Sequence, residues 1–338
     1  MSASGIPYHL RPHKAVDRRL FLDLLSRCER WQPLQDFAYI SMGGYPLEDH
    51  KAIHRRFGIT RLLAFDNDEA IVRRQTFNRP TSACKCLHRD SEDVVASLDG
   101  ILFEAKFSDA EGIVVWLDYT NAQIGAQLRQ FQSVLEQVAA NDIVRITLNA
   151  KADNLGLPDR TDGRRTSKDH VDEYRLDVLS KRAGDFLPSG VTRESVSQAN
   201  YPLTLALALR AAASKAFSPT DPYVFSPLSL VTYADQQPML SMTGMKIARS
   251  DEEEMRKTLG LANWPFSSAD WADVHQLAVA DLTVRERLFL ERAILRLSPA
   301  QMEEQLGFDL EAVTDVPGFL SNYKKYHRFY PTFLSAEI

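Results

Sequence analysis

The fold is decided by residues 37–80, which read FAYISMGGYPLEDHKAIHRRFGITRLLAFDNDEAIVRRQTFNRP. The apolar run Phe37–Met42 predicts a strand, and the pair Gly43-Gly44 follows it directly. A helical segment at Leu47–Phe57 leads to a second apolar run, Arg61–Asp66, which predicts another strand and ends in a carboxylate. The order strand, glycine turn, helix, strand and acid is typical of Rossmann-like folds.

This order predicts a ligand site where the two strands end. A glycine backbone lets a ligand approach closely, and a carboxylate at a strand tip accepts hydrogen bonds from ribose hydroxyls. We therefore expect Gly43, Gly44 and Asp66 to bind an adenosine-containing cofactor, with Asp68 as the alternative ribose ligand. Two simpler interpretations stay open: Gly43-Gly44 forms only a tight turn, and Asp68 only adds a favourable charge at a helix N-terminus.

Strands and helices alternate over the first 150 residues. The run Ile113–Leu117 is continuously apolar, as expected of a parallel strand covered on both faces. The predicted strands are Phe37–Met42, Arg61–Asp66, Ala83–Leu87, Ile113–Asp118 and Ile143–Asn149, with helices at about 15–30, 47–57, 68–77, 91–98 and 126–140. This alternation predicts an α/β, doubly wound, Rossmann-like sheet.

Two further extended runs close the sheet. Phe225–Tyr233 and Pro238–Ile247 are separated by Ala234–Gln237, which predicts an antiparallel hairpin. Five alternating strands followed by such a hairpin is the sheet plan of the class I S-adenosylmethionine methyltransferases. A dehydrogenase domain would continue with a sixth parallel strand and carry the Gly-x-Gly-x-x-Gly fingerprint, which this chain lacks.

The chain is expected to contain two parts. Residues 1–250 form the Rossmann-like domain, with an insertion at about 151–190, and residues 251–338 form a helical C-terminal subdomain. The polar insertion is expected to act as a lid or substrate loop, or only as a solvated loop. In the C-terminal part, Ser298-Pro299 predicts a helix start and Gly307 a helix end.

Candidate reactive groups follow the third and fourth strands. Asp118 closes the fourth strand, where it could orient or deprotonate a methyl acceptor, and Tyr119 could pack against that acceptor. Asp90 and Ser91 follow the third strand, where folds of this kind contact adenine. The alternatives are that Asp118 caps a turn and that Ser91 is the N-cap of the next helix.

Other polar residues were weighed as substrate or metal ligands. Arg11 and Lys14 precede the first helix and could bind an anionic substrate, or belong to an ordinary solvated helix start. His50 and His54 share a helix face, but no third ligand is identifiable. We expected the side chains of Cys84 and Cys86 to point to opposite faces of a strand, and therefore predicted no metal site.

Composition argues against several other classes of protein, namely nucleic-acid-binding, membrane-spanning and disulfide-rich proteins. The chain has 338 residues, 44% of them hydrophobic and 25% charged, with a formal net charge of −5, so it resembles an ordinary globular protein without a general attraction to nucleic acid. Its longest apolar runs are too short to span a bilayer. The first residues lack the apolar core of a signal peptide, and three cysteines do not make a disulfide framework. We expect a cytoplasmic protein with no membrane association.

Several motifs resemble one family of bacterial proteins described as O-methyltransferases. They are Leu10-Arg11-Pro12-x-Lys14-x-Val16-Asp17-Arg18, Gly43-Gly44-x-x-x-Glu48-Asp49, Phe77-Asn78-Arg79-Pro80 and Trp116-Leu117-Asp118-Tyr119-Thr120. The similarity covers roughly residues 7–250. It implies a class I methyltransferase fold and S-adenosylmethionine as cofactor, with an unknown oxygen or nitrogen acceptor.

An alternative function belongs to another class. The fold could serve as a catalytically degenerate nucleotide-sensing or assembly module of a multi-protein bacterial system, with the helical C-terminus binding a protein partner. The basic and aromatic run Tyr323–Tyr330 could contact nucleic acid, but a packed terminal helix is the favoured interpretation.

Overall fold

The computed structural model describes residues 12–158, 167–234, 237–280, 282–308, 310 and 315–330. Contacts divide the chain into two units. The larger unit comprises residues 24–232 and 237–275, and the smaller unit comprises the described parts of residues 1–23, 233–236 and 276–338. The division of the chain at residue 250 stays a prediction.

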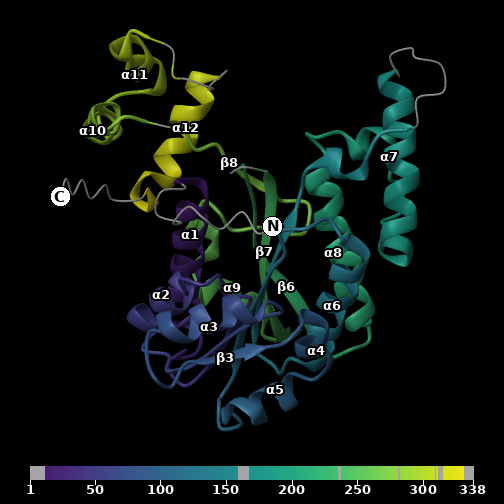
Figure 1. Cartoon of the computed structure of the whole chain (residues 1–338). Helices are drawn as coiled ribbons and strands as arrows, with labels where there is room; N and C mark the ends of the chain where they lie inside the picture. Colours follow the sequence, from purple (N-terminus) through teal and green to yellow (C-terminus); the bar gives the residue numbers. More distant parts are fainter. Residues whose placement is uncertain are drawn as a thin grey trace. The chain divides into compact units, whose positions relative to one another are not determined.

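The strands form one mixed sheet in the order β3-β2-β1-β4-β5-β7-β6-β8 (Figure 1). Neighbours among β1 to β5 are parallel, and β7 pairs with β5 in the antiparallel direction. The bounds are β1 Ala38–Ser41, β2 Arg61–Asp66, β3 Lys85–His88, β4 Ile113–Asp118, β5 Ile143–Asn149, β6 Tyr223–Ala234, β7 Pro238–Ala248 and β8 His275–Leu277. The predicted parallel sheet with a closing antiparallel hairpin is therefore confirmed.

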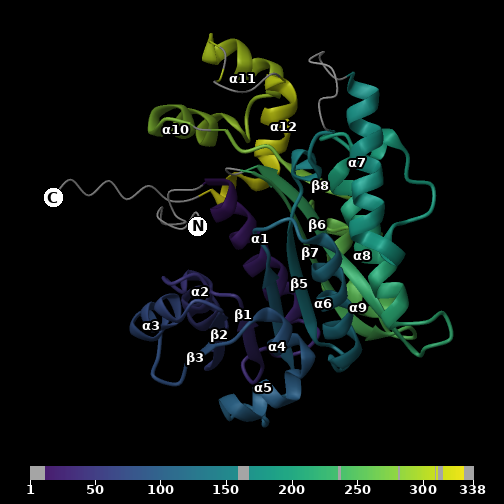
Figure 2. The same cartoon turned by 45° about the vertical axis from the view of Figure 1, so that its right-hand side comes forward.

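Helices cover both faces of the sheet in the larger unit. Figures 1 and 2 show α2 and α3 on one side and α4, α6 and α8 on the other. The helices are α1 Pro12–Cys28, α2 Glu48–Phe57, α3 Glu69–Asn78, α4 Ser91–Ala96, α5 Leu98–Ala105, α6 Ile124–Gln137, α7 Lys168–Ala183, α8 Tyr201–Ala216 and α9 Glu252–Thr258. The sequence analysis does not predict α5 or α8. No helix among the described residues is both long and apolar enough to cross a membrane.

The core explains why the central strands are apolar. All residues of β5 and the first five of β4 are buried, because helices pack on both faces. Helix α6 packs against α8, and Leu128 and Phe131 of α6 are fully buried. Each buried side chain of this size contributes about 1.5–3 kcal/mol to the free energy of folding.

The smaller unit contains α10 Val284–Ala293, α11 Pro299–Leu306 and α12 Val316–Tyr326. The predicted start and end of α11 are confirmed, because Ser298 accepts a hydrogen bond from the Gln301 N–H and Gly307 has a φ of 68°. The short strand β8 is a departure from the purely helical pattern that we expected.

The aromatic residues of the run 323–330 belong to the core of this smaller unit. Tyr323 and Tyr326 are fully buried, and the Tyr326 hydroxyl donates a hydrogen bond to the Ala278 carbonyl. The Tyr330 hydroxyl donates in the same way to Ala280. These rings are packed inside the unit, so their faces are not presented for stacking on bases.

Candidate functional site

The candidate residues of the larger unit gather at one edge of the sheet. Because β1, β2, β3 and β4 are parallel, their carboxyl ends lie at the same edge. Ser41 ends β1 beside Ala64 of β2 and Trp116 of β4, and Asp66 pairs with His88 at the end of β3. Asp118 ends β4 two residues beyond Trp116. The fold therefore collects the glycine loop and these carboxylates on adjacent strands.

The glycine loop is a tight turn packed against α2 and α3. The Gly43 N–H donates to the Ser41 carbonyl at 2.9 Å, and the Leu47 N–H donates to the Gly44 carbonyl at 3.0 Å. A Cβ atom at Gly43 would lie 2.6 Å from Leu47 Cδ2 and 2.9 Å from His50 Cε1. Glycine is therefore required at position 43 by packing, whatever the loop binds.

Two buried side chains on these helices lie against the loop, and the sequence analysis missed both roles. Gln75 of α3 donates a hydrogen bond to the Gly43 carbonyl. His50 of α2 donates from Nε2 to the Leu63 carbonyl at 3.1 Å, and burial lowers the pKa of His50 to about 4. His54 contacts a different carbonyl, that of Ile59, at 2.8 Å. The signal available in the sequence was that His50 shares a helix face with apolar Ile53.

Backbone N–H groups nearby in the sequence bind the carboxylates at the tip of β2. Asp66 is half-buried, and its Oδ1 accepts the Asp68 N–H at 2.9 Å. Burial raises the pKa of Asp66. Asp68 is the N-cap of α3, since its Oδ1 accepts the Ala70 N–H at 2.8 Å. Asp68 thus lies at a helix N-terminus, as its alternative interpretation expects, and its role toward a ribose stays a prediction.

The tips of β2 and β3 are joined through Asn67. Its Nδ2 donates to Asp90 Oδ1 at 3.3 Å, and the His88 Nε2 donates to the Asn67 carbonyl at 3.0 Å. Asp90 is exposed and occupies the N-cap position of α4. The alternative interpretation of Ser91 as that N-cap is wrong, because Ser91 is the first residue of the helix itself.

Ser91 and Tyr119 come together although 28 positions separate them in the sequence. Their side chains are hydrogen-bonded, and the Tyr119 hydroxyl also donates to Gln130 Oε1. Tyr119 is 7% exposed, and burial raises the pKa of its hydroxyl. Tyr119 is therefore a neutral phenol at physiological pH, which suits a packing and orienting role.

Asp118 lies half-buried at the tip of β4, in register with Thr147 of β5. Asn149, at the end of β5, supports the loop beyond it by donating to the Thr120 carbonyl at 3.1 Å and accepting from Asn154 Nδ2 at 2.8 Å. The sequence analysis did not single out Asn149. These bonds fix the backbone next to Asp118.

The described residues cover the predicted substrate residues and the polar insertion only in part. Lys14 is in the first turn of α1, in the smaller unit, and is 7% exposed. Arg11 lies outside the described residues, as does 159–166 of the polar insertion. The insertion continues into α7, which begins at Lys168. The assignments of Arg11 and Lys14 stay predictions.

Cys84 lies immediately before β3, and Cys86 lies within it. The expectation that their side chains point to opposite faces of a strand is wrong, because residues two apart along a strand share a face.

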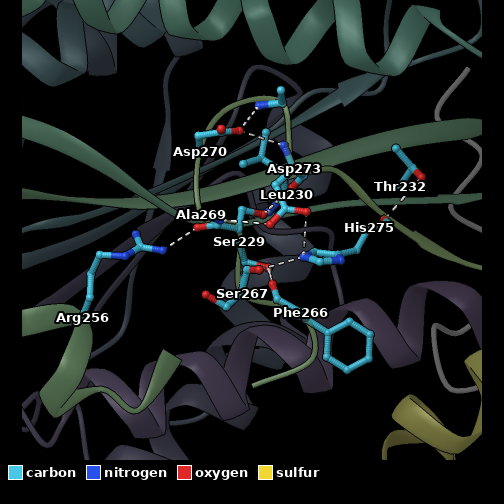
Figure 3. A network of polar contacts seen from close by, with 12 residues as sticks. Ser229, Leu230, Thr232, Arg256, Phe266, Ser267, Ala269, Asp270, Asp273 and His275 are labelled. Carbon is cyan, nitrogen blue, oxygen red and sulfur yellow. Dashed lines mark hydrogen bonds and ion pairs between the residues drawn. The ribbon is translucent and has the colours of Figure 1, made fainter. Parts of the chain in front are cut away.

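A second polar cluster in the larger unit is structural (Figure 3). Ser268 accepts the Leu230 N–H at 2.8 Å and donates to the Asp273 carbonyl at 2.6 Å. His275 donates to the Ser267 carbonyl at 2.8 Å, and Ser229 donates to the Phe266 carbonyl at 2.7 Å. Both serine hydroxyls donate to the backbone rather than to the imidazole, so the cluster attaches residues 266–275 to β6 and is not a nucleophilic triad.

The strand order and the antiparallel β7 define a Rossmann-like protein of class I methyltransferase type. The family comparison matches residues 6–338 to the family described as "Putative O-methyltransferase". The chain belongs to this family. This finding confirms the family resemblance and extends it from the expected residues 7–250 to nearly the whole chain, and it supports S-adenosylmethionine as the cofactor.

Comparison with curated proteins gives no match. Among solved structures, the chain is similar to Trm1 from Pyrococcus horikoshii in complex with S-adenosyl-L-methionine, at 10% identity and a TM-score of 0.41, over 72% of this chain and 57% of that one. It is similar to the N-methyltransferase NodS from Bradyrhizobium japonicum at 10% identity and a TM-score of 0.34, over 69% and 97%. A methyltransferase from Mesorhizobium loti matches at 14% identity and a TM-score of 0.35, over 65% and 96%. The chain thus spans little more than half the length of the Pyrococcus protein.

Proposed function

We propose that this protein is an S-adenosylmethionine-dependent methyltransferase that methylates an oxygen atom of its acceptor. The observation that carries the proposal is the shared sheet edge of the glycine loop, Asp66 and Asp118 in a chain of an O-methyltransferase family. In folds of this kind, ligands bind outside the carboxyl ends of the parallel strands.

The residues at this edge fit the parts of the cofactor. The turn at Gly43 and Gly44 follows β1 directly, so the loop backbone lies at the edge where the cofactor is proposed to bind. The half-buried Asp66 offers carboxylate oxygens to two ribose hydroxyls. Asp90 and Ser91 are the residues that we expect to contact the adenine ring. When bound, S-adenosylmethionine supplies an electrophilic methyl group on a positively charged sulfur.

Asp118 is the group assigned to the acceptor. Its carboxylate accepts a hydrogen bond from an acceptor hydroxyl and takes the proton as the oxygen attacks. Tyr119 packs against the acceptor, with its phenol oriented by Ser91 and Gln130. Most of the rate acceleration then comes from holding donor and acceptor in line.

Binding measurements on Asp66→Ala test the proposal. S-adenosylhomocysteine and S-adenosylmethionine are titrated calorimetrically into the wild type and the variant. Loss of charged hydrogen bonds to the ribose is expected to weaken binding by about tenfold to a hundredfold.

A matched control is Asp109→Ala. Asp109 pairs at 2.7 Å with Arg61, the residue that begins β2. The substitution therefore removes an aspartate that contacts the opposite end of the strand from Asp66. This control is expected to bind both compounds like the wild type. Equal affinities for all three proteins would remove Asp66 from the site, and absence of binding to the wild type would contradict the proposed function.

A further inference from the structure

Helix α3 holds the glycine loop, residues 43–47, through two side-chain amides. The amide of Gln75 donates a hydrogen bond to the Gly43 carbonyl. The amide of Asn78, the last residue of α3, donates to the Tyr45 carbonyl at 3.1 Å. Because α3 follows the tip of β2 along the chain, this one helix connects the two parts of the candidate cofactor site, the loop after β1 and the acid at the end of β2.

The stability of the core does not explain why position 75 is a glutamine. The Gln75 side chain is completely buried, and its Oε1 has no hydrogen-bond partner among the described residues. A buried acceptor without a partner destabilises a folded protein, whereas methionine has a similar size and no such acceptor. The feature that distinguishes glutamine here is the hydrogen bond to the loop.

The other carbonyls of the loop are occupied as well. Lys51 of α2 donates to the Pro46 carbonyl at 2.7 Å, and the Gly44 carbonyl accepts the Leu47 N–H at 3.0 Å. The four consecutive carbonyls of residues 43–46 therefore all accept hydrogen bonds. Leu47 is buried and has a φ of 51°, in the left-handed region that leucine rarely adopts. Such a conformation persists where the surrounding contacts hold it in place.

The groups of the loop that still lack a partner are N–H groups. Within the part of the chain that the structure describes, nothing accepts from the N–H of Gly44 or of Tyr45, and both residues are half-buried. Successive backbone N–H groups in a turn form a binding place for an anion. The guanidinium of Arg74 lies 3.4 Å from the centroid of the Tyr45 ring and adds positive charge beside the loop.

The strand order indicates which anion this is. The neighbouring strands β3, β2, β1 and β4 end, in this order, near the residues assigned to adenine, at Asp66, at the glycine loop and at Asp118. In S-adenosylmethionine the sulfur joins the ribose to the amino-acid part, whose carboxylate is the one anionic group of the cofactor. With the ribose at β2 and the methyl acceptor at β4, the amino-acid part falls at the loop after β1.

We propose that Gln75 and Asn78 are positioning residues, which hold the glycine loop so that its N–H groups bind the carboxylate of S-adenosylmethionine. This inference rests on the proposed function. It is tested by calorimetric titration of two ligands into the wild type and Gln75→Met. S-adenosylhomocysteine carries the amino-acid part, whereas 5′-methylthioadenosine shares the adenosine and the sulfur but lacks that part.

The variant is expected to bind S-adenosylhomocysteine about tenfold more weakly than the wild type and 5′-methylthioadenosine within about twofold of it. Equal weakening of both ligands would show a merely structural role, and unchanged affinity for S-adenosylhomocysteine would show no role; either result overturns the proposal. Failure of the wild type to bind either ligand would instead contradict the proposed function.

The matched control is Thr76→Ala on the same helix. Thr76 is exposed and donates to the Val72 carbonyl within α3 at 2.9 Å, so this variant is expected to bind both ligands like the wild type. If Gln75→Met does not fold, Asn78→Ala gives the same comparison of ligands.

Hydrogen–deuterium exchange of the unliganded proteins provides a readout that needs no cofactor. Gln75→Met is expected to exchange faster than the wild type in peptides covering residues 41–47 and to keep the same midpoint of urea denaturation. Unchanged exchange in these peptides would show that Gln75 does not hold the loop.

Discussion

At the scale of single residues, the turn at Gly43 is supported by buried polar side chains of two helices. Gln75 of α3 donates a hydrogen bond to the Gly43 carbonyl, and His50 of α2 packs beside Gly43 while it donates to the Leu63 carbonyl of β2. Gly43 and Asp66 were predictable from their places after two apolar runs, and both lie at the same sheet edge. The role of Gln75 was not predictable, because its bond to Gly43 is made across 32 residues and leaves no local pattern.

His50 predicts an acid sensitivity of the folded state. Its pKa is about 4 in the folded protein against 6.5 ordinarily, because burial disfavours the imidazolium ion. Between these values the unfolded chain binds a proton that the folded chain does not, so the free energy of unfolding falls as the pH drops from 6.5 toward 4. The contribution is about 3 kcal/mol over the whole interval.

Urea denaturation of the wild type and His50→Gln at a series of pH values checks this prediction. Glutamine retains a donor for the Leu63 carbonyl but does not titrate. The variant is expected to show a shallower fall of the unfolding free energy between pH 6.5 and 4. The same slope in both proteins would show that His50 is not buried in its neutral form.

At the scale of elements, apolar runs located the parallel strands well. β2, β4 and β5 have the predicted bounds, because a strand covered on both faces is rich in apolar residues, although β5 also buries Arg145 and Thr147. Helix α8 was missed because it is alanine- and leucine-rich on several sides and so lacks a clear polar face. Strand β8 has only three residues, which are too few to form a pattern that predicts a strand or its pairing in the sheet.

The attachment of residues 266–275 to β6 depends on Ser268. Ser268→Ala leaves the buried Leu230 N–H and the Asp273 carbonyl without this partner. We expect a loss of about 1–3 kcal/mol in the free energy of unfolding, measured by urea denaturation.

The control for this prediction is Ser250→Ala. Ser250 is exposed and bonds only to Asp251 at 2.8 Å, so its removal is expected to change the unfolding free energy by less than about 0.5 kcal/mol. A Ser268→Ala variant as stable as this control would show that the cluster does not stabilise the sheet edge.

At the scale of the whole molecule, fold class and family were predictable, and the grouping of the two chain ends in one unit was not. The alternation of strands and helices and the closing hairpin are patterns in neighbouring residues, so they appear in the sequence. The grouping of residues 12–23 with the described residues after 275 arises from contacts between segments far apart in the sequence. One such contact joins Arg328 to Asp23 at 3.3 Å, and its partners are 305 positions apart.

The central claim is that the carboxyl edge of β1, β2 and β3 binds the methyl donor. Hydrogen–deuterium exchange with and without S-adenosylhomocysteine tests it most directly, because it reports where the ligand protects the backbone. We predict slower exchange in peptides covering residues 41–47, 66–70 and 89–94, and unchanged exchange in 252–258 and 266–275. Protection confined to other peptides, with these three unaffected, would contradict the account.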